Sequence, residues 1–277
     1  GADSTVYEHG LLTVPDTSET DGGSFQVSAS DGIKEVVIGG ATFSLAQLQD
    51  AGYLAAHTVN TGEGTLTLTG YSSSDDKSAT ITYSYTLAAA QEHGLPGNDS
   101  LTDSVGVTVN GVGGSSDSAN LSISIIDDIP VATGDGTQTV TEDGNGTTTL
   151  QTVTGGVLGN DSYGADGANV DAGTAFSWDA NTAAKAALAT YGTLTLGSDG
   201  TYTFTLDNSS AAVQGLTSSS VIEQTLTYTI TDHDGDTSPA SVTIRIVGAN
   251  DSAQVTVSAE GADSTVYEHG LLTVPDT

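Results

Sequence analysis

The sequence predicts an all-β protein built from two tandem antiparallel β-sandwich domains, with one or two short helices. Three observations support this prediction: apolar residues alternate with serine and threonine in short runs, turn residues separate these runs, and few segments show a helical period. Strands with one apolar and one hydroxyl-rich face are typical of antiparallel sheets that have one face in water. Such runs recur in both halves of the chain, which favours a sandwich in each half.

The alternating runs define the expected strands. In the first half they are 64–71, 79–88, 104–109 and 120–126. In the second half, two runs within 191–207 are joined by Ser198, Asp199 and Gly200, which predicts a β-hairpin. The runs 224–232 and 241–248 are expected to form another pair of strands.

Helical patterns are confined to two short segments. Residues 44–52 begin with Ser44 as a candidate N-cap and stop at Gly52. Residues 181–192 are rich in alanine, with Asn181 as a plausible cap. Both are expected to be short insertions in an all-β protein.

Two breaks divide the chain. Each follows a strong strand pattern and mixes acidic residues with proline, glycine or small residues, at 127–130 and at 248–254. We therefore expect domain one at 1–127, a linker at 128–130 and domain two at 131–250. Residues 251–277 are expected to be a linker and the first strand of a further copy of domain one.

The last seventeen residues repeat the first seventeen. The sequence GADSTVYEHGLLTVPDT occupies both 1–17 and 261–277, an offset of 260 residues, which is the size of two ordinary domains. The chain therefore resembles one period of a longer tandem array. The strand pattern at 254–260 has no counterpart before Gly1, so domain one is expected to lack its own first strand. Segment 252–277 is then expected to fit the open edge of domain one, by folding back or head to tail in a neighbouring molecule.

Charge composition excludes several partners. The chain has 35 acidic residues against 4 basic ones, a formal net charge of −31. This charge repels nucleic acid and anionic membranes, and no apolar run is long enough for direct membrane insertion. The absence of cysteine excludes disulfides and thiolate metal ligands. Because self-repulsion destabilises a compact acidic chain, bound cations or a high-salt environment are expected.

The acidic residues gather where the predicted strands end. Asp232, Asp234 and Asp236 alternate around a glycine in TDHDGD, between two strands. Calcium takes six to eight oxygen ligands, and the glutamate that an EF-hand needs at position twelve is replaced here by Thr243. The remaining ligands must therefore come from elsewhere in the fold. Solvated turn residues are the alternative, since aspartate is common in hairpin loops.

Strand directions suggest where these ligands come from. The strand 241–247 separates the DHDGD loop from the second linker, so the loop should face domain one. Three groups are then expected to converge at the junction: Asp99 with Asp103 from the loop 89–103, Asp127 with Asp128, and the three aspartates of the DHDGD loop. A second junction is expected to contain Asn250 and Asp251, with Glu268, the copy of Glu8, entering the next domain.

Several motifs resemble those of repeat domains in bacterial RTX adhesins, which are exported by type I secretion. YTITDHDGDTSPASVTIRIVGANDSA is similar to the end of a VCBS repeat, and YGTLTLGSDGTYTFTLDN to its central hairpin. In domain one, VYEHG, DGIKEVVIGG, GTLTLTGY, YSYTLAAAQEHG and ISIIDDIPVA occur in the order of a type I secretion target repeat. The chain departs from the family pattern at 107–121, which lacks the usual acidic turn, and at the second linker, which has Ala253 and Gln254 where proline is usual.

The resemblance implies Ig-like, Greek-key sandwiches in a row with calcium at their junctions. Carried over by position, the implied ligands are Asp127, Asp128, Asp232, Asp234, Asp236, Asn250 and Asp251, with Glu142 near the start of domain two. It implies a structural extender that projects an adhesive tip from the cell surface in a secreted, outer-membrane-anchored protein. The neighbouring repeat domains of the same chain would be its partners.

Three other function classes remain open from the residues alone. A carbohydrate- or surface-binding sandwich is the main alternative, although the sole tryptophan, Trp178, is expected to serve packing. An enzyme is not expected, because no GxSxG, HExxH or P-loop motif occurs. Adaptation to high salt without specific calcium binding would also explain the acidity.

Overall fold

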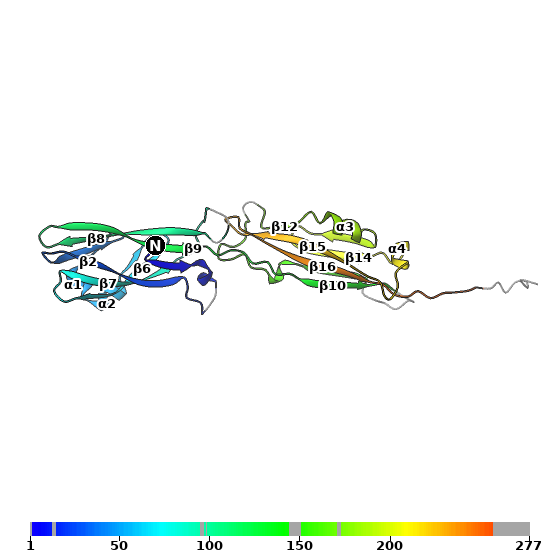
Figure 1. Cartoon of the computed structure of the whole chain (residues 1–277), viewed down its shortest axis with the longest axis horizontal. Helices are drawn as coiled ribbons and strands as arrows, with labels where there is room; N and C mark the ends of the chain where they lie inside the picture. The colour runs from blue at the N-terminus through cyan, green and yellow to red at the C-terminus, as the bar shows by residue number, and fades with distance from the viewer. Residues whose placement is uncertain are drawn as a thin grey trace, which may run out of the picture.

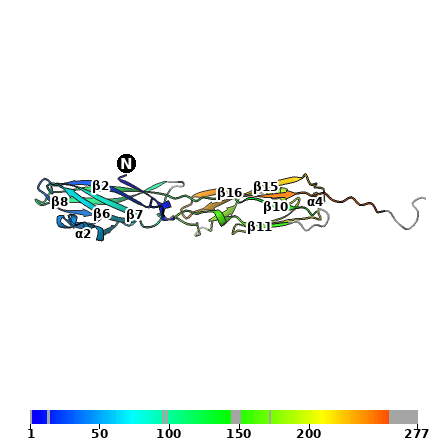
Figure 2. The same cartoon turned by 90° about the horizontal axis from the view of Figure 1, so that it is seen from below.

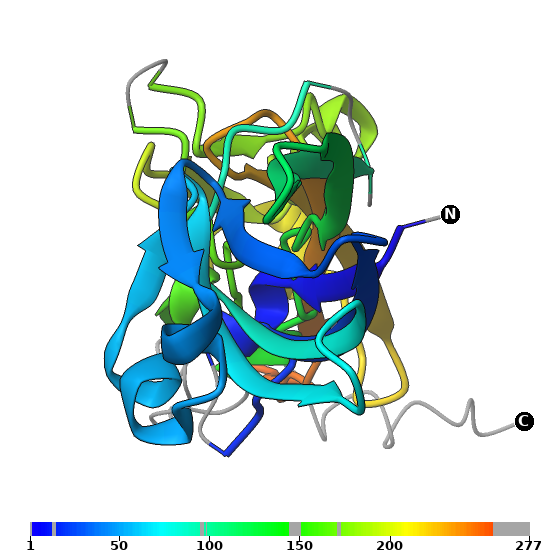
Figure 3. The same cartoon turned by 90° about the vertical axis from the view of Figure 1, so that its left-hand side faces the viewer.

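The chain forms two elongated β-sandwich domains joined end to end (Figure 1). A quarter turn about the long axis shows the same arrangement (Figure 2), and the view along that axis shows one domain in front of the other (Figure 3). The computed structural model describes residues 2–12, 15–94, 97, 99–143, 151–170 and 173–256. The predicted all-β fold of two sandwiches is therefore confirmed.

Domain one consists of two facing sheets. The first has the order β1-β9-β8-β3-β4: β1 (Ser4–Tyr7), β9 (Ser116–Ile126), β8 (Ser100–Gly111), β3 (Ile33–Ile38) and β4 (Ala41–Ser44). The second has the order β2-β7-β6-β5: β2 (Thr20–Ser28), β7 (Ser78–Leu87), β6 (Gly64–Ser73) and β5 (Thr58–Asn60). Three short helices complete it: η1 (Glu8–Leu11), α1 (Leu45–Leu48) and α2 (Ala51–Ala56).

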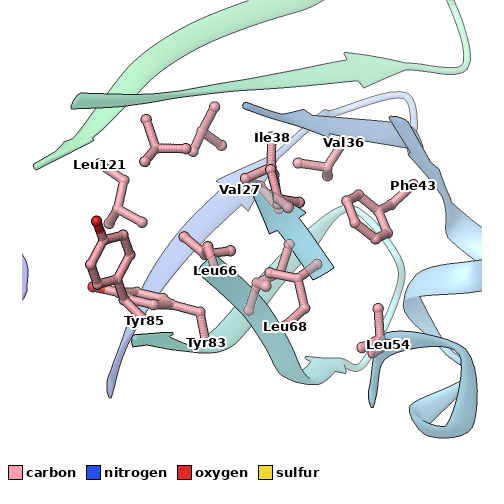
Figure 4. Packing of buried hydrophobic residues seen from close by; sticks show 14 of the residues in the cluster. Val27, Val36, Ile38, Phe43, Leu54, Leu66, Leu68, Tyr83, Tyr85 and Leu121 are labelled. Carbon is pink, nitrogen blue, oxygen red and sulfur yellow. The ribbon is translucent and has the colours of Figure 1, made fainter. Parts of the chain in front are cut away.

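The core of domain one lies between the two sheets. Successive strand residues point to opposite faces, so alternate apolar residues share the inner one. Leu66 and Leu68 on β6, and Tyr83 and Tyr85 on β7, are at most 2% exposed for this reason. They meet residues of the other sheet, including Ile38 (Figure 4). Burial of such side chains contributes about 1.5–3 kcal/mol each.

Domain two repeats this architecture. One sheet has the order β10-β16-β15-β12: β10 (Gly136–Thr141), β16 (Thr237–Val247), β15 (Val221–Thr231) and β12 (Phe176–Trp178). The other has the order β11-β14-β13: β11 (Thr152–Gly156), β14 (Thr201–Leu206) and β13 (Gly192–Leu196). The helices are η2 (Leu158–Asn160), α3 (Thr182–Leu188) and α4 (Ala211–Gln214). The predicted hairpin at 191–207 is β13–β14, and the predicted pair of later strands is β15–β16.

Trp178 belongs to an aromatic group in domain two. Its ring makes edge contacts with Phe176, Tyr202 and Tyr228, and its indole N–H donates to the carbonyl of Gly197 at 3.0 Å. The expectation of a packing role is confirmed, because the side chain is half-buried and its polar atom is satisfied within the domain.

The predicted helices differ in detail. The predicted stop at Gly52 was wrong, because the segment contains α1 and the start of α2, which continues to Ala56. Ser44 closes a capping box with Gln47, and Asp50 then caps the second helix through the backbone N–H groups of Gly52 and Tyr53. The helix predicted at 181–192 is α3, but the side chain of Asn181 does not cap it. The described residues contain more helices than the one or two predicted.

The first strand of each domain corrects one expectation. β1 is paired parallel to β9, and β10 parallel to β16, whereas antiparallel pairing was expected throughout. The missing counterpart of 254–260 stays a prediction, since β1 lies within the repeated residues 1–17. The alternation of apolar and polar residues indicates which face of the sheet a side chain lies on. It does not indicate which strand pairs with it, or in which direction. Because of the parallel pairing, β1 and β10 carry the chain to the end of the domain where its last strand finishes.

Candidate metal centre at the domain junction

Five segments meet where domain one joins domain two. The loop between β15 and β16 lies at this end of domain two, as the strand directions predicted, beside the segment that contains Asp166. Across from it lie the linker after β9, the loop before β8 and the turn after β1. The backbone N–H of Gly97 donates to Oδ1 of Asp236 at 2.5 Å, so the two domains are in direct contact.

Three overlapping groups of potential metal ligands lie at this junction. Within each group, the ligand atoms lie within 4.8 Å of one another. The groups are Glu8, His93 and Asp127; Asp127, Asp166 and Asp234; and Asp232, Asp234 and Asp236. Asp127 belongs to two groups and Asp234 to two, so we treat them as one continuous cluster, called here the junction cluster.

The DHDGD loop has a local reason to turn its carboxylates inward. Oδ1 of Asp232 accepts the N–H groups of Gly235 at 3.1 Å and Asp236 at 2.6 Å. Gly235 has φ of +108°, which a glycine adopts without strain. Oδ2 of Asp232, Oδ2 of Asp236 and both carboxylate oxygens of Asp234 are buried and accept no hydrogen bond from the described residues.

Glu8 enters the cluster from domain one. It follows β1 directly and is fully buried. Its Oε1 accepts from the backbone N–H of Gln91 at 2.7 Å and lies 3.2 Å from Nε2 of His93. His93 Nδ1 lies 2.5 Å from Oδ1 of Asp99. Since both ring nitrogens contact carboxylates, His93 positions Glu8 and Asp99 rather than offering a lone pair to a cation. Burial opposes its charge, but the contacts with Asp99 and Glu8 prevail and raise the pKa of His93.

Crowding and burial make the charged form of these carboxyls unfavourable without a cation. Burial, with the charges of Glu8 and Asp234, raises the pKa of Asp166 to about 7. Burial and the charge of Asp234 raise the pKa of Asp127, and burial with a contact from Asp234 raises that of Asp232. Burial also raises the pKa of Glu8, despite its contacts with Gln91 and His93.

The donors of the junction cluster suit a hard divalent cation. They are almost all carboxylate oxygens, several are buried without a hydrogen-bond donor, and calcium and magnesium select such oxygens. Among the described residues, no lysine or arginine comes within 4.0 Å of them; Lys34 pairs with Glu35 and Arg245 with Glu223. Apart from His93, which contacts Glu8, neutralisation must therefore come from protons or from a bound cation, and the residues fit calcium.

Three predicted ligands lie at or near the junction but outside the three groups. Asp99 accepts from His93, as described above, and Oδ2 of Asp128 accepts the backbone N–H of Ala165 at 3.0 Å. Asp103 was expected in a loop, but β8 begins at Ser100 and places it within the strand, facing inward. Its carboxylate accepts the hydroxyl of Tyr85 at 2.8 Å, which satisfies both buried groups.

The far end of domain two carries another predicted group. Glu142 is fully buried after β10, and its Oε2 accepts the backbone N–H of Ala249 at 2.9 Å. Asn250 Oδ1 accepts the N–H of Ser218 at 2.9 Å, and Asp251 is exposed. Glu268 lies outside the described residues.

The two glutamates that follow the first strands correct the expected layout. Glu142 was expected near the start of domain two, and Glu8, through its copy, at the entry to a domain. The structure places each at the end where its domain finishes, because β1 and β10 run parallel to β9 and β16. Glu8 and Glu142 are thus equivalent positions in the two domains.

Sequence reasoning missed two residues of the junction cluster, Asp166 and His93. Asp166 lies in the GADG segment, whose glycines predict only a loop. Its position follows from a bridge between Ala168 and Asp232, which brings that loop beside the DHDGD turn. The signal for His93 was its place between Gln91 and Asp99 in the loop already expected at the junction.

The raised pKa values predict opposite pH dependences with and without calcium. Asp127, Asp166, Asp232 and Glu8 bind protons more tightly folded than unfolded, so their stabilisation is complete below about pH 4. It is lost as the pH rises through about 7. In chelator, we expect the free energy of unfolding to fall by about 1 kcal/mol or more between pH 5 and 8. In excess calcium it should rise, because calcium binds only the deprotonated carboxylates.

Urea unfolding at pH 5, 6, 7 and 8 measures this difference. Asp166→Asn is the matched variant, since it removes one carboxyl group whose pKa is raised. In chelator it should reduce the change of the free energy of unfolding with pH. Parallel slopes in calcium and in chelator would contradict the assignment of these groups to a cation site.

Comparison with known proteins gives a match in domain two. Residues 127–248, less than half of the chain, match the family described as "Bacterial cadherin-like domain". The match supports a cadherin-like repeat of the Ig type in this part of the chain, and with it an adhesion-type structural repeat. Comparison with curated proteins gave no match. No helix among the described residues has the length and apolarity that a membrane span requires.

Among solved structures, the similar chains include cadherin ectodomains. Mouse clustered PcdhgC3 EC1-3 is 14% identical, with 90% of this chain and 66% of that chain covered and a TM-score of 0.27. Drosophila N-cadherin EC1-4 is 11% identical, with coverages of 89% and 47% and a TM-score of 0.28. The human desmocollin-1 ectodomain is 11% identical, with coverages of 88% and 38% and a TM-score of 0.26. The chain thus spans about two thirds or less of each.

Proposed function

We propose that the chain is a calcium-stabilised extender repeat of a large secreted bacterial adhesin, which holds an adhesive tip away from the cell surface. The observation that carries this proposal is the composition of the junction cluster. Glu8 comes from domain one, Asp127 from the end of domain one directly after β9, and Asp166 and Asp234 from domain two, within overlapping groups of ligand atoms. Cations bound there would join the two domains and the linker at one point.

Electrostatics gives the cations a mechanical role. Without them, buried carboxylates from two domains repel one another across the junction, which favours separation of the domains. With them, the same carboxylates attract shared ions, and bending at the linker would require breaking those bonds. The proposed result is a joint that is stiff in calcium and loose without it.

The far end of domain two supports a repeating arrangement. Glu142 matches Glu8 in burial and in its position after a first strand, and Asn250 and Asp251 follow β16 as Asp127 and Asp128 follow β9. A following domain with a similar acidic loop would complete a second calcium-binding junction. An array of this period would thus carry calcium-dependent joints along its length.

Calcium dependence also suits the proposed type I export. Extracellular calcium modules bind with Kd of about 10⁻⁴–10⁻³ M, so such sites would be largely empty in the cytosol. Ligands that bind only the folded state stabilise it by mass action. The chain would therefore remain easier to unfold before export and become stable outside the cell.

Small-angle X-ray scattering in calcium and in EGTA tests the proposal. We expect one extended shape in calcium, and a shorter average maximum dimension with a broader distance distribution in EGTA. Sodium chloride at matched ionic strength is the control for general charge screening, and it should not restore the extended shape. A scattering curve unchanged by EGTA, or restored equally by sodium, would contradict the proposed extender and favour adaptation to high salt.

A further inference from the structure

Domain two contains a second set of converging oxygen atoms, which shares no residue with the junction cluster. It surrounds the hydroxyl of Tyr228, a fully buried residue of β15. Four oxygen atoms lie within 3.1–3.3 Å of this hydroxyl: Oδ2 of Asp135, Oδ1 of Asp161, and the backbone carbonyl oxygens of Thr133 and Val157. Two carboxylates and two carbonyls therefore face one point inside a single domain.

The distances show that the hydroxyl does not satisfy these acceptors. An O–H···O hydrogen bond normally measures about 2.5–3.0 Å, and all four contacts of the Tyr228 hydroxyl are longer. The hydroxyl has one proton, so it can serve at most one of the four acceptors well. Oδ2 of Asp161 is also buried and accepts no hydrogen bond from the described residues. Because buried polar atoms are normally paired, the arrangement points to a further occupant.

Neighbouring hydrogen bonds hold the acceptors in place. Backbone bonds join Val131 and Ser162 in both directions, at 2.8 and 2.9 Å. The N–H of Thr133 donates to Oδ1 of Asp161 at 2.7 Å, and Nδ2 of Asn160 donates to the Thr133 carbonyl at 2.9 Å. These donors are neutral. They fix the positions of the acceptors and leave the carboxylate charges uncompensated.

The charge and spacing of these atoms fit a calcium ion. Neither Asp135 nor Asp161 forms an ion pair with any of the described residues, and their two negative charges equal the charge of one divalent cation. Calcium takes six to eight oxygen ligands at about 2.3–2.6 Å, so ligands at right angles around it lie about 3.3–3.7 Å apart. The spacing of 3.1–3.3 Å from the Tyr228 hydroxyl to its neighbours is close to this distance.

We propose that domain two binds one calcium ion between Asp135 and Asp161, in front of the Tyr228 hydroxyl. Both carboxylate oxygens of Asp161, Oδ2 of Asp135, the hydroxyl, and the carbonyls of Thr133 and Val157 give six oxygen ligands. The ion would tie together β15, the segment that enters β10 and the residues around η2. It would stabilise the sandwich of domain two by itself, without any contribution from domain one or from the proposed extender.

Terbium luminescence tests the proposal, because terbium takes the oxygen ligands of calcium and emits when a nearby aromatic ring transfers excitation to it. Trp178 is the sole tryptophan of the chain, and its ring centroid lies 5.9 Å from that of Tyr228. With tryptophan excitation, the unmodified chain should give terbium emission that excess calcium displaces. Asp135→Asn should lower this emission at least about tenfold. No emission from the unmodified chain, or unchanged emission from Asp135→Asn, would overturn the proposal.

Two matched variants separate this site from the other acidic residues. Asp199→Asn changes an exposed turn aspartate of the same domain, which hydrogen-bonds Thr201, and it should leave the emission unchanged. Asp234→Asn changes the junction cluster, and it should lower calcium binding there without changing the emission sensitised by Trp178. Equal loss of emission in all three variants would show general attraction of cations to an acidic chain, against the proposal.

Thermal unfolding shows whether Asp135 serves an ion or only the fold. In EGTA, Asp135→Asn should unfold at the same temperature as the unmodified chain or higher, because it removes one of two neighbouring negative charges. In calcium it should unfold at a temperature lower by about 4 °C or more. An equal decrease in both buffers would assign Asp135 to a structural network with Tyr228 and overturn the proposal.

Small-angle scattering keeps this site and the proposed extender apart. In calcium, Asp135→Asn should retain the extended shape of the unmodified chain, because the junction cluster is unchanged. If the shape of the unmodified chain does not respond to EGTA while Asp135→Asn still loses the terbium emission, the proposed extender is wrong and the calcium site of domain two stands.

Discussion

Removal of calcium with EGTA should lower the unfolding temperature of the chain by about 10 °C at neutral pH. A site with Kd of about 10⁻⁴–10⁻³ M contributes about 1.4–2.7 kcal/mol in ~10 mM calcium. The junction cluster contains overlapping groups that can hold at least two ions. Each kcal/mol shifts the melting temperature of a protein of this size by about 2–4 °C. Differential scanning calorimetry measures the change.

The shape of the transition adds a second test. In calcium, ions bound by residues of both domains should couple the two sandwiches, so the chain should unfold in a narrow transition. In EGTA, we expect the transition to broaden or to separate into two, one for each domain. Magnesium at equal concentration is the matched control. It requires a compact octahedral site and retains its water, so it should replace calcium only weakly. A melting temperature that does not respond to EGTA would contradict the calcium assignment.

Asp234→Asn should have opposite effects with and without calcium. Its carboxylate belongs to two of the three groups, so the substitution should remove half or more of the stabilisation that calcium provides. In EGTA it should stabilise the chain by about 1 kcal/mol, because the charge of Asp234 contributes to the raised pKa of Asp127, Asp166 and Asp232. Urea unfolding in both buffers, with calorimetric calcium titration, measures the two effects.

Asp199→Asn is the matched control for this substitution. Asp199 is also a turn aspartate of domain two, but it is exposed and hydrogen-bonds Thr201 in its own turn. Asparagine retains the acceptor oxygen, so stability should change by less than about 0.5 kcal/mol in either buffer. If Asp234→Asn destabilises the chain equally in calcium and in EGTA, its role is structural, and the cluster would not be a cation site.

The part of the fold that depends on alternation could be predicted from the sequence. Tyr83 and Tyr85 face the core because strand residues two apart share a face, and the hairpin at 191–207 follows from its turn residues. The parallel pairing of β1 and β10 could not be predicted from the sequence. The alternation of a strand of four or six residues is equally compatible with parallel and antiparallel pairing. For the same reason, the sequence did not indicate that Glu8 and Glu142 lie at the ends where their domains finish.

The part of the candidate site that depends only on charge and on the order of the strands could be predicted from the sequence. The DHDGD loop and Asp127 meet as expected, since both lie at strand ends that face the junction. Asp166 was missed because its place depends on a tertiary bridge and not on local spacing. Asp103 was assigned to the loop because the start of β8 is not marked in the sequence. Within the strand its side chain points inward, where its carboxylate accepts a hydrogen bond from the Tyr85 hydroxyl.

The parallel first and last strands determine how each sandwich would respond to tension. When the two ends of a domain are pulled apart, its first strand is drawn one way and its last strand the other, so the bonds between them are sheared together rather than peeled open in turn. This mechanical clamp has six residue pairs in domain two, β10 with β16, and four in domain one, β1 with β9. Domain one would then yield first under load.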